Sequence, residues 1–251
     1  METGTIQTIT TDSVTTITFA HPASNALPGA LLRQLAQAIE AAGQATESTI
    51  IVLQSGGERT FCAGANFAEL AAIATPEQGR VFFSGFAGVI NACRRCPKLI
   101  VGRIQGKAVG GGVGLAAAVD YCIATTAASV RLSELLIGIG PFVVGPAIER
   151  KIGLAGFSHL TLSPETAFPA NWAAQKGLYN ELTDTTAELD IAVLKKAREL
   201  AGYNPDTLRE LKRAFWHGTD HWDKLLTERA ETSGLLVLSD ATKAAIGRFR
   251  A

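Results

Sequence analysis

The segment that most constrains the fold spans residues 100–140 and is rich in glycine. Three consecutive glycines, Gly110–Gly112, stand between an apolar run at residues 99–101 and a helix of small residues at 115–119. Glycines gather where the backbone approaches a ligand closely or adopts conformations closed to other residues. A helix that begins among them directs free N–H groups at whatever lies there. One carboxylate, Glu134, follows in an otherwise apolar stretch. The segment therefore predicts a ligand site.

Composition narrows the classes of partner. A chain of 251 residues with 47% hydrophobic and 18% charged residues is long enough for a sizeable core. Its 23 Lys and Arg residues balance 23 Asp and Glu residues, which argues against nucleic acid or an anionic membrane as partner. The apolar runs are too short to span a bilayer. Four cysteines and an N-terminus without signal-peptide features predict a reducing, cytoplasmic location.

Strand and helix patterns alternate along the first half of the chain. Residues 5–10 and 14–19 predict a hairpin, and 49–53, 99–104 and 121–124 predict buried strands. Helices are predicted after Pro28, from Asn66 as cap to residue 73, and from Pro76 to residue 95. Later helices are predicted at 143–152, 155–162, 170–176, 186–200, 205–216, 220–232 and 240–248, with one strand at 178–182. This order predicts an α/β core followed by a helical C-terminal region.

A dinucleotide-binding site is one reading of the glycine segment. Residues 112–117 match G-x-G-x-x-A, and Glu134 follows about 20 residues later. In such a site the glycine turn follows its strand directly and opens the domain. Here residues 105–109 intervene, and about 100 residues precede the match. These two departures disfavour the dinucleotide-binding interpretation.

Two further patterns invite a metal interpretation. Cys93 and Cys96 form a single C-x-x-C, without a second Cys or His pair at zinc-binding spacing. His217 and His221 are four residues apart, but the glutamate of an H-E-x-x-H site is missing between them. Structural cysteines and a surface or packing role for the histidines are the favoured interpretations, so no metal site is predicted.

Two glycine-containing turns form the third candidate. One comprises residues 61–66 and the other 109–112, and each lies between a predicted strand and a predicted helix. If the fold brings them together, each turn can direct one backbone N–H at the same oxygen. Two such donors make an oxyanion hole, which stabilises an enolate-like charge on a thioester carbonyl. From the residues alone, two ordinary tight turns remain an equally good interpretation.

Several motifs, in order, resemble the crotonase superfamily of enoyl-CoA hydratases and isomerases. They are Asn25-Ala26-Leu27, the FCAGANF run at 61–67, Gly106 with Gly110–Gly112, Asp120, Leu132-Ser133-Glu134, Leu136-Ile137-Gly138 and Gly140-Pro141. The resemblance covers about residues 5–185. It implies a spiral core of ββα units at 1–185, a helical trimerisation region at 186–251, and a homotrimer or a dimer of trimers.

The resemblance also implies which residues form the site. The two oxyanion donors fall on the backbone N–H groups of Ala65 and Gly111, and the acid/base group falls on Glu134. The coenzyme A part of an acyl-CoA substrate falls on Ala23, Ser24, Ala26, Ala63, Asn66, Phe67 and Leu70. Neither a metal nor a cofactor other than this substrate-borne coenzyme A is implied. The acyl pocket is expected near Phe82, Phe86 and Phe142.

One departure from the family pattern leaves the reaction open. Typical hydratases carry two glutamates, and the first falls here on Gly114. A single carboxylate suits isomerisation of a Δ3 to a Δ2 enoyl-CoA. GGGVGL with LSE and a proline-aromatic pair also resembles a bacterial subgroup of methylglutaconyl-CoA or related branched acyl-CoA hydratases, which likewise lacks the first glutamate. A non-catalytic acyl-CoA-binding relative is the alternative. Glu134 could also be an inert carboxylate bonded to backbone N–H groups near Gly138.

Overall fold

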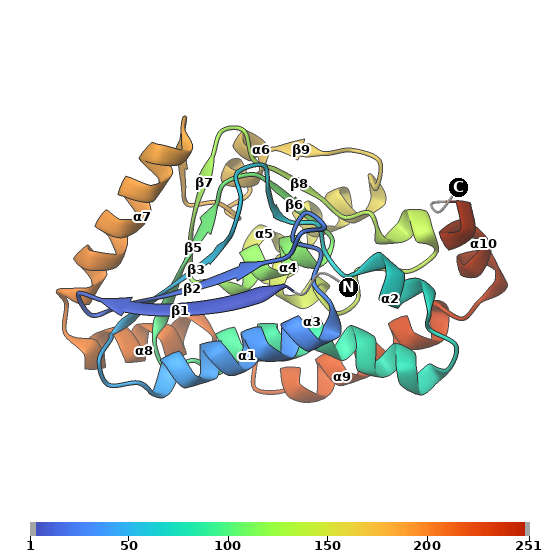
Figure 1. Ribbon diagram of the computed structural model, residues 1–251, viewed down its shortest axis with the longest axis horizontal. Helices are drawn as coiled ribbons and strands as arrows, with labels where there is room; N and C mark the ends of the chain where they lie inside the picture. Colours follow the sequence, from blue (N-terminus) through green and yellow to red (C-terminus); the bar gives the residue numbers. More distant parts are fainter. Residues whose placement is uncertain (1–3, 249–251) are drawn as a thin grey trace.

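Two β-sheets form the centre of the molecule (Figure 1). The computed structural model describes residues 4–248; residues 1–3 and 249–251, at the ends of the two predicted regions, lie outside the described residues. The larger sheet has the order β1-β2-β3-β5-β7-β10 and the smaller has the order β4-β6-β8-β9. The larger sheet comprises β1 (Thr5–Thr11), β2 (Val14–Ala20), β3 (Ile50–Ser55), β5 (Leu99–Ile104), β7 (Tyr121–Thr125) and β10 (Glu181–Thr183). The smaller comprises β4 (Thr60–Cys62), β6 (Lys107–Val109), β8 (Ser129–Arg131) and β9 (Phe168–Pro169).

A ββα unit repeats three times and winds the chain into a spiral. In each unit the first strand joins the larger sheet, the second joins the smaller sheet, and a helix follows. The strand pairs are β3 with β4, β5 with β6, and β7 with β8, and equivalent strands of successive units pair in parallel. The mixed α/β fold and the helical C-terminal region predicted from the sequence are therefore confirmed.

Helices cover both sides of the larger sheet. They are α1 (Gly29–Gln44), α2 (Phe67–Ala71), α3 (Pro76–Arg95), α4 (Gly111–Ala118), the 3₁₀ helix η1 (Glu134–Ile137), α5 (Gly145–Leu162), α6 (Ala170–Gln175), α7 (Thr186–Ala201), α8 (Pro205–Phe215), α9 (Trp222–Leu236) and α10 (Asp240–Arg248). Figure 1 shows α7 along one face, while α1, α3 and α9 pack together on the other side. The apolar residues of α7 form one core cluster with the outer face of the sheet.

Local sequence explains most helix boundaries. Thr75 accepts the Gln78 N–H, and the Gln78 side chain accepts the Thr75 N–H in return, which caps α3 as a capping box. Asn66 accepts the Glu69 N–H at 3.0 Å and caps α2, as predicted. The two helices predicted at 143–152 and 155–162 correspond to the two helical segments of α5, which are separated by non-helical backbone at Gly153, whose φ is +71°.

The sequence patterns missed several short strands. Strands β4, β6, β8 and β9 have two or three residues each, too few for an alternating pattern to stand out. Residues 105–109, which appeared to separate a strand from the glycine turn, contain β6 itself. The glycine turn therefore does follow a strand directly, contrary to the expectation from the spacing, and this strand belongs to the second sheet. The last strand is β10, shorter and later than the predicted 178–182, and α9 begins and ends later than the predicted 220–232.

Candidate active site

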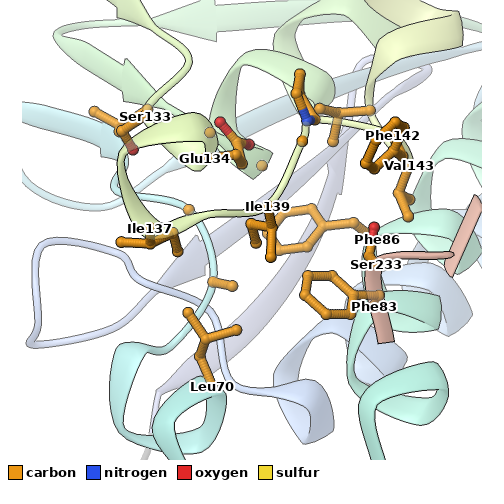
Figure 2. Close-up of a pocket in the computed structure, with 18 of the residues that line it drawn as sticks. Leu70, Phe83, Phe86, Ser133, Glu134, Ile137, Ile139, Phe142, Val143 and Ser233 are labelled. Carbon is orange, nitrogen blue, oxygen red and sulfur yellow. The ribbon is translucent and has the colours of Figure 1, made fainter. Parts of the chain in front are cut away.

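One apolar cavity of about 270 Å³ lies between α3, the start of α4 and η1 (Figure 2). The residues that line it include Ala63, Gly64, Ala65, Phe67, Leu70, Phe82, Phe83, Phe86, Gly110, Gly111, Glu134, Ile137, Ile139, Phe142, Val143, Val144 and Ser233. Phe82, Phe86 and Phe142 are the aromatic residues predicted from the sequence. Phe83 and Ser233 were missed, because helices α3 and α9 bring them to the cavity only through tertiary packing.

Glu134 is the only carboxylate among the described residues that line this cavity. Its Oε2 atom is fully shielded from solvent and has no hydrogen-bond partner in the described part of the chain. Burial raises the pKa of its carboxyl group to about 7, because the charged form loses solvation. A group with this pKa can gain and lose a proton near neutral pH.

The backbone N–H groups after Glu134 do not hold its carboxylate. The Gly138 N–H donates to the Leu135 carbonyl oxygen, and the Ile139 N–H donates to the Glu134 carbonyl oxygen, both at 3.1 Å. These bonds close the turn and leave the carboxylate facing the cavity. The neighbouring Leu135 does not help to enclose the carboxylate, because it is 46% exposed.

Gly110 brings the carboxylate against the start of α4. Its φ of +52° lies in the region that favours glycine. A Cβ atom built on Gly110 would lie 3.0 Å from Glu134 Oε1. The Gly110 N–H donates to the Arg131 carbonyl oxygen at 2.8 Å, which ties this turn to the end of β8. The glycine therefore permits both the turn and the close approach of Glu134.

The two glycine-containing turns do lie together. A Cβ atom built on Gly64 would be 3.5 Å from the Gly111 nitrogen and 3.0 Å from the Val109 carbonyl oxygen. The Leu27 N–H donates to the Gly64 carbonyl oxygen and the Asn66 N–H to the Leu27 carbonyl oxygen, so these bonds pass on either side of Ala65. Within residues 4–248, neither the Ala65 nor the Gly111 N–H has a hydrogen-bond partner. Both residues line the same cavity as Glu134.

The residues that the resemblance assigns to coenzyme A lie in the cavity lining or in the loop beside it. Ala63, Phe67 and Leu70 line the cavity. The Ala63 N–H donates to the Ser24 carbonyl oxygen at 3.2 Å, which places the loop of Ala23, Ser24 and Ala26 beside Asn66 and its neighbours. Their role in binding stays a prediction.

Asn25 is a positioning residue that the sequence interpretation missed. Its φ is +57°, and its side-chain amide donates to the Gly56 and Thr60 carbonyl oxygens at 2.8 and 2.9 Å. Its Oδ1 accepts the His21 N–H at 2.8 Å. The residue type could have indicated this role, because asparagine tolerates a left-handed backbone conformation and its side chain forms hydrogen bonds with nearby backbone groups.

Gly114 lies outside the described lining of the cavity, and its side-chain position is already filled. A Cβ atom built there would lie 2.5 Å from Val144 Cγ1 and 2.7 Å from Val144 Cβ. Val144 begins the turn into α5, and α4 packs directly against α5. A side chain at position 114 therefore has no room in this structure unless Val144 moves.

We expect Gly114→Ala to destabilise the protein by about 1–3 kcal/mol, because the added methyl group overpacks the contact with Val144. Alanine otherwise favours a helix over glycine by about 1 kcal/mol, so the loss comes from the contact. Urea unfolding would measure it. The double variant with Val144→Ala should recover much of the loss, whereas additive effects of the two substitutions would contradict this account.

The other sequence-level candidates do not form a second reactive site. Cys93 and Cys96 are buried, and burial raises the pKa of the Cys93 thiol to about 12. Burial likewise raises the pKa of Cys62, beside the glycine turn, to about 12, so its reactive thiolate is suppressed. Among residues 4–248, no group of three His, Cys, Asp or Glu side chains is placed to hold a metal ion.

No helix in the described part of the chain is both long and apolar enough to cross a membrane.

Comparison with known proteins agrees with the fold. A sequence model described as enoyl-CoA hydratase/isomerase matches residues 10–244. The chain belongs to the enoyl-CoA hydratase/isomerase family. This is the crotonase superfamily that the motifs predicted. The family acts on acyl-CoA substrates.

Two relatives and one solved structure illustrate the similarity. The chain is 31% identical over 200 residues to the mitochondrial methylglutaconyl-CoA hydratase of Mus musculus, covering 78% of this chain and 63% of that protein. It is 30% identical to the mevalonyl-coenzyme A hydratase SIDH of Beauveria bassiana, covering 91% and 84%. An enoyl-CoA hydratase/isomerase structure from Xanthobacter autotrophicus Py2 has a TM-score of 0.87 and 25% identity, covering 98% of this chain and 92% of that one.

Proposed function

We propose that this protein adds water to, or removes water from, the acyl group of a coenzyme A thioester, with Glu134 as its single acid/base residue. The observation that carries the proposal is the position of Glu134. Its carboxylate, whose Oε2 atom is buried and has no partner among the described residues, opens into the same apolar cavity as the free N–H groups of Ala65 and Gly111. Two backbone donors and one proton acceptor around one space are what formation of a thioester enolate requires.

The reaction follows from these three groups. In the dehydration direction, the Glu134 carboxylate removes a proton from the α-carbon, and the thioester carbonyl becomes an enolate. The Ala65 and Gly111 N–H groups donate to the enolate oxygen. The enolate then collapses to a carbonyl, the C2=C3 bond forms, and the C3–O bond breaks. The protonated Glu134 gives its proton to the departing hydroxyl, which leaves as water. Hydration is the reverse.

One carboxylate can carry both protons when the α-hydrogen and the hydroxyl leave from the same face. The hydratase names of the two relatives favour this reaction. A second candidate is isomerisation of a 3-enoyl to a 2-enoyl thioester, in which Glu134 moves one proton between two carbons. The filled space beside Gly114 favours it, because no second carboxylate can help to hold a water molecule.

Incubation of the purified protein with a panel of acyl-CoA thioesters, followed by mass analysis, tests the proposal. The panel comprises 2-enoyl, 3-enoyl and 3-hydroxyacyl thioesters. We expect a gain or loss of one water molecule. A shift of the double bond at unchanged mass would favour the isomerase, and binding without any conversion would favour the non-catalytic alternative.

We also propose the assembly and location that the resemblance implies. The protein would be a cytoplasmic homotrimer or dimer of trimers, and would require no metal and no cofactor besides the coenzyme A of its substrate. Large exposed apolar side chains on the C-terminal half, such as Leu162, Ile191 and Leu235, support association.

A further inference from the structure

Phe82, on α3, lies between two cavities. It lines the apolar cavity of Glu134, and it also lines an outer cleft formed by α1, α3 and the segment after α2. The outer cleft includes the apolar side chains of Ala30, Ile73 and Val81. Its volume is about 470 Å³, compared with about 270 Å³ for the inner cavity. Phe82 is the one described residue common to both linings, and we infer that its side chain forms the partition between the two spaces.

The partition stands at the end of the cavity away from the carboxylate. Figure 2 shows Glu134 on one side of the cavity, and Leu70 and Phe83 on the other. Phe82 packs edge-to-face on Phe83, with 5.1 Å between the ring centroids, and joins the apolar cluster of Leu70. A thioester whose carbonyl oxygen lies near Ala65 and Gly111 would extend its acyl chain toward this end, which makes Leu70 a contact of the acyl chain in place of the coenzyme A contact that the resemblance implies.

We propose that Phe82 limits the length of the acyl chain and makes the protein selective for short acyl groups. The inference rests on the proposed function, since it assumes that the thioester lies beside Glu134. The inner cavity is just below the ~300–1,000 Å³ typical of ligand pockets. A longer chain meets the Phe82 ring, and removal of the ring joins the cavity to the apolar side of the outer cleft.

Calorimetric titration with saturated acyl-CoA thioesters tests this selectivity without requiring turnover. The series runs from butanoyl-CoA to dodecanoyl-CoA. Each methylene that becomes buried should strengthen binding by about fourfold. For the unmodified protein we expect no further gain between hexanoyl-CoA and decanoyl-CoA. For Phe82→Ala we expect decanoyl-CoA to bind at least about tenfold more tightly than hexanoyl-CoA.

Val81→Ala is the matched control. Val81 is 49% exposed and lines the outer cleft only, so this variant should keep the original length profile. Phe82→Leu, with a smaller side chain, provides an intermediate step if the alanine variant does not fold. A folded Phe82→Ala protein with an unchanged profile would overturn the proposal, as would steady strengthening with chain length before substitution.

The titration tests the role of Phe82 separately from the proposed reaction. A length profile that shifts in Phe82→Ala, without turnover of any thioester, would leave the role of Phe82 in place and refute the reaction. Hydration or dehydration of short thioesters, with an unchanged length profile in Phe82→Ala, would support the reaction and refute the role of Phe82. If the protein bound none of the thioesters, both proposals would fall.

Discussion

Replacement of Glu134 with glutamine should lower kcat by about 10²–10⁴-fold, the usual contribution of a general acid/base residue. Glutamine has nearly the same shape but cannot accept and return a proton. The Ala65 and Gly111 N–H groups do not depend on the carboxylate, so the Kd for a saturated acyl-CoA should change little. Steady-state kinetics and calorimetric titration on the same preparation measure the two quantities.

The matched control is Glu149→Gln, the same chemical change at an exposed position on α5. It should leave kcat unchanged. Turnover by Glu134→Gln at the rate of the unmodified protein would remove Glu134 from the chemistry. A parallel loss of thioester binding would instead indicate that the substitution disturbs the cavity.

The pH dependence of stability supplies an independent check on the same residue. Burial raises the pKa of Glu134 from 4.5 to about 7, so below pH 4.5 both the folded and the unfolded chain carry the proton. Between pH 4.5 and 7 the unfolded chain ionises while the folded chain stays protonated, and stability falls as the pH rises. Glutamine does not ionise. The Tm of Glu134→Gln should therefore match that of the unmodified protein at pH 4 and exceed it at pH 8.

The second large effect is expected at a buried ion pair that joins the C-terminal helices to the core. Lys212 Nζ on α8 lies 2.6 Å from Asp120 Oδ2, and their side chains are only 3% and 4% exposed. The same carboxylate accepts the Trp216 Nε1–H and the Ile100 N–H, both at 2.8 Å. Lys212→Met would leave a buried carboxylate without its counter-ion, which costs about 3–5 kcal/mol.

Arg213→Met is the control for this prediction, because Arg213 is adjacent in sequence and pairs with Glu210 in solvent. Those two side chains are 69% and 66% exposed, and an exposed pair contributes at most about 1 kcal/mol. Urea unfolding of both variants gives the comparison. Equal losses for the two substitutions would mean that the Asp120–Lys212 pair does not anchor α8.

The elements that could be predicted from the sequence are the long ones with a strong hydrophobic pattern. The amphipathic helices and the apolar strands in the middle of the larger sheet carry enough residues to show their period. The second sheet could not be predicted, because β4, β6, β8 and β9 are too short to show an alternating hydrophobic pattern. Asp120 was visible as part of a motif, but its partner Lys212 lies 92 residues later, and only tertiary packing brings the two together.

Some features of the candidate site could likewise be predicted from the sequence, and others could not. The glycine turns and Glu134 could be identified because backbone geometry and a lone carboxylate leave a local trace in the sequence. The consequence of Gly114 could not be read there, because Val144, which fills the missing side chain's space, lies 30 residues away on the next ββα unit. Likewise, the role of Phe82 depends on two cavities that exist only in the folded chain.

The most direct test of the central claim is exchange of the α-protons of an acyl-CoA with solvent deuterium, followed by mass spectrometry or NMR. Exchange needs only the enolate, so it probes Glu134 and the two N–H donors regardless of whether water is added or a double bond moves. We expect deuterium at the α-carbon of butanoyl-CoA with the unmodified protein at pH 8, and none above background with Glu134→Gln. Equal exchange by both proteins, or none by either when the thioester is bound, would contradict it.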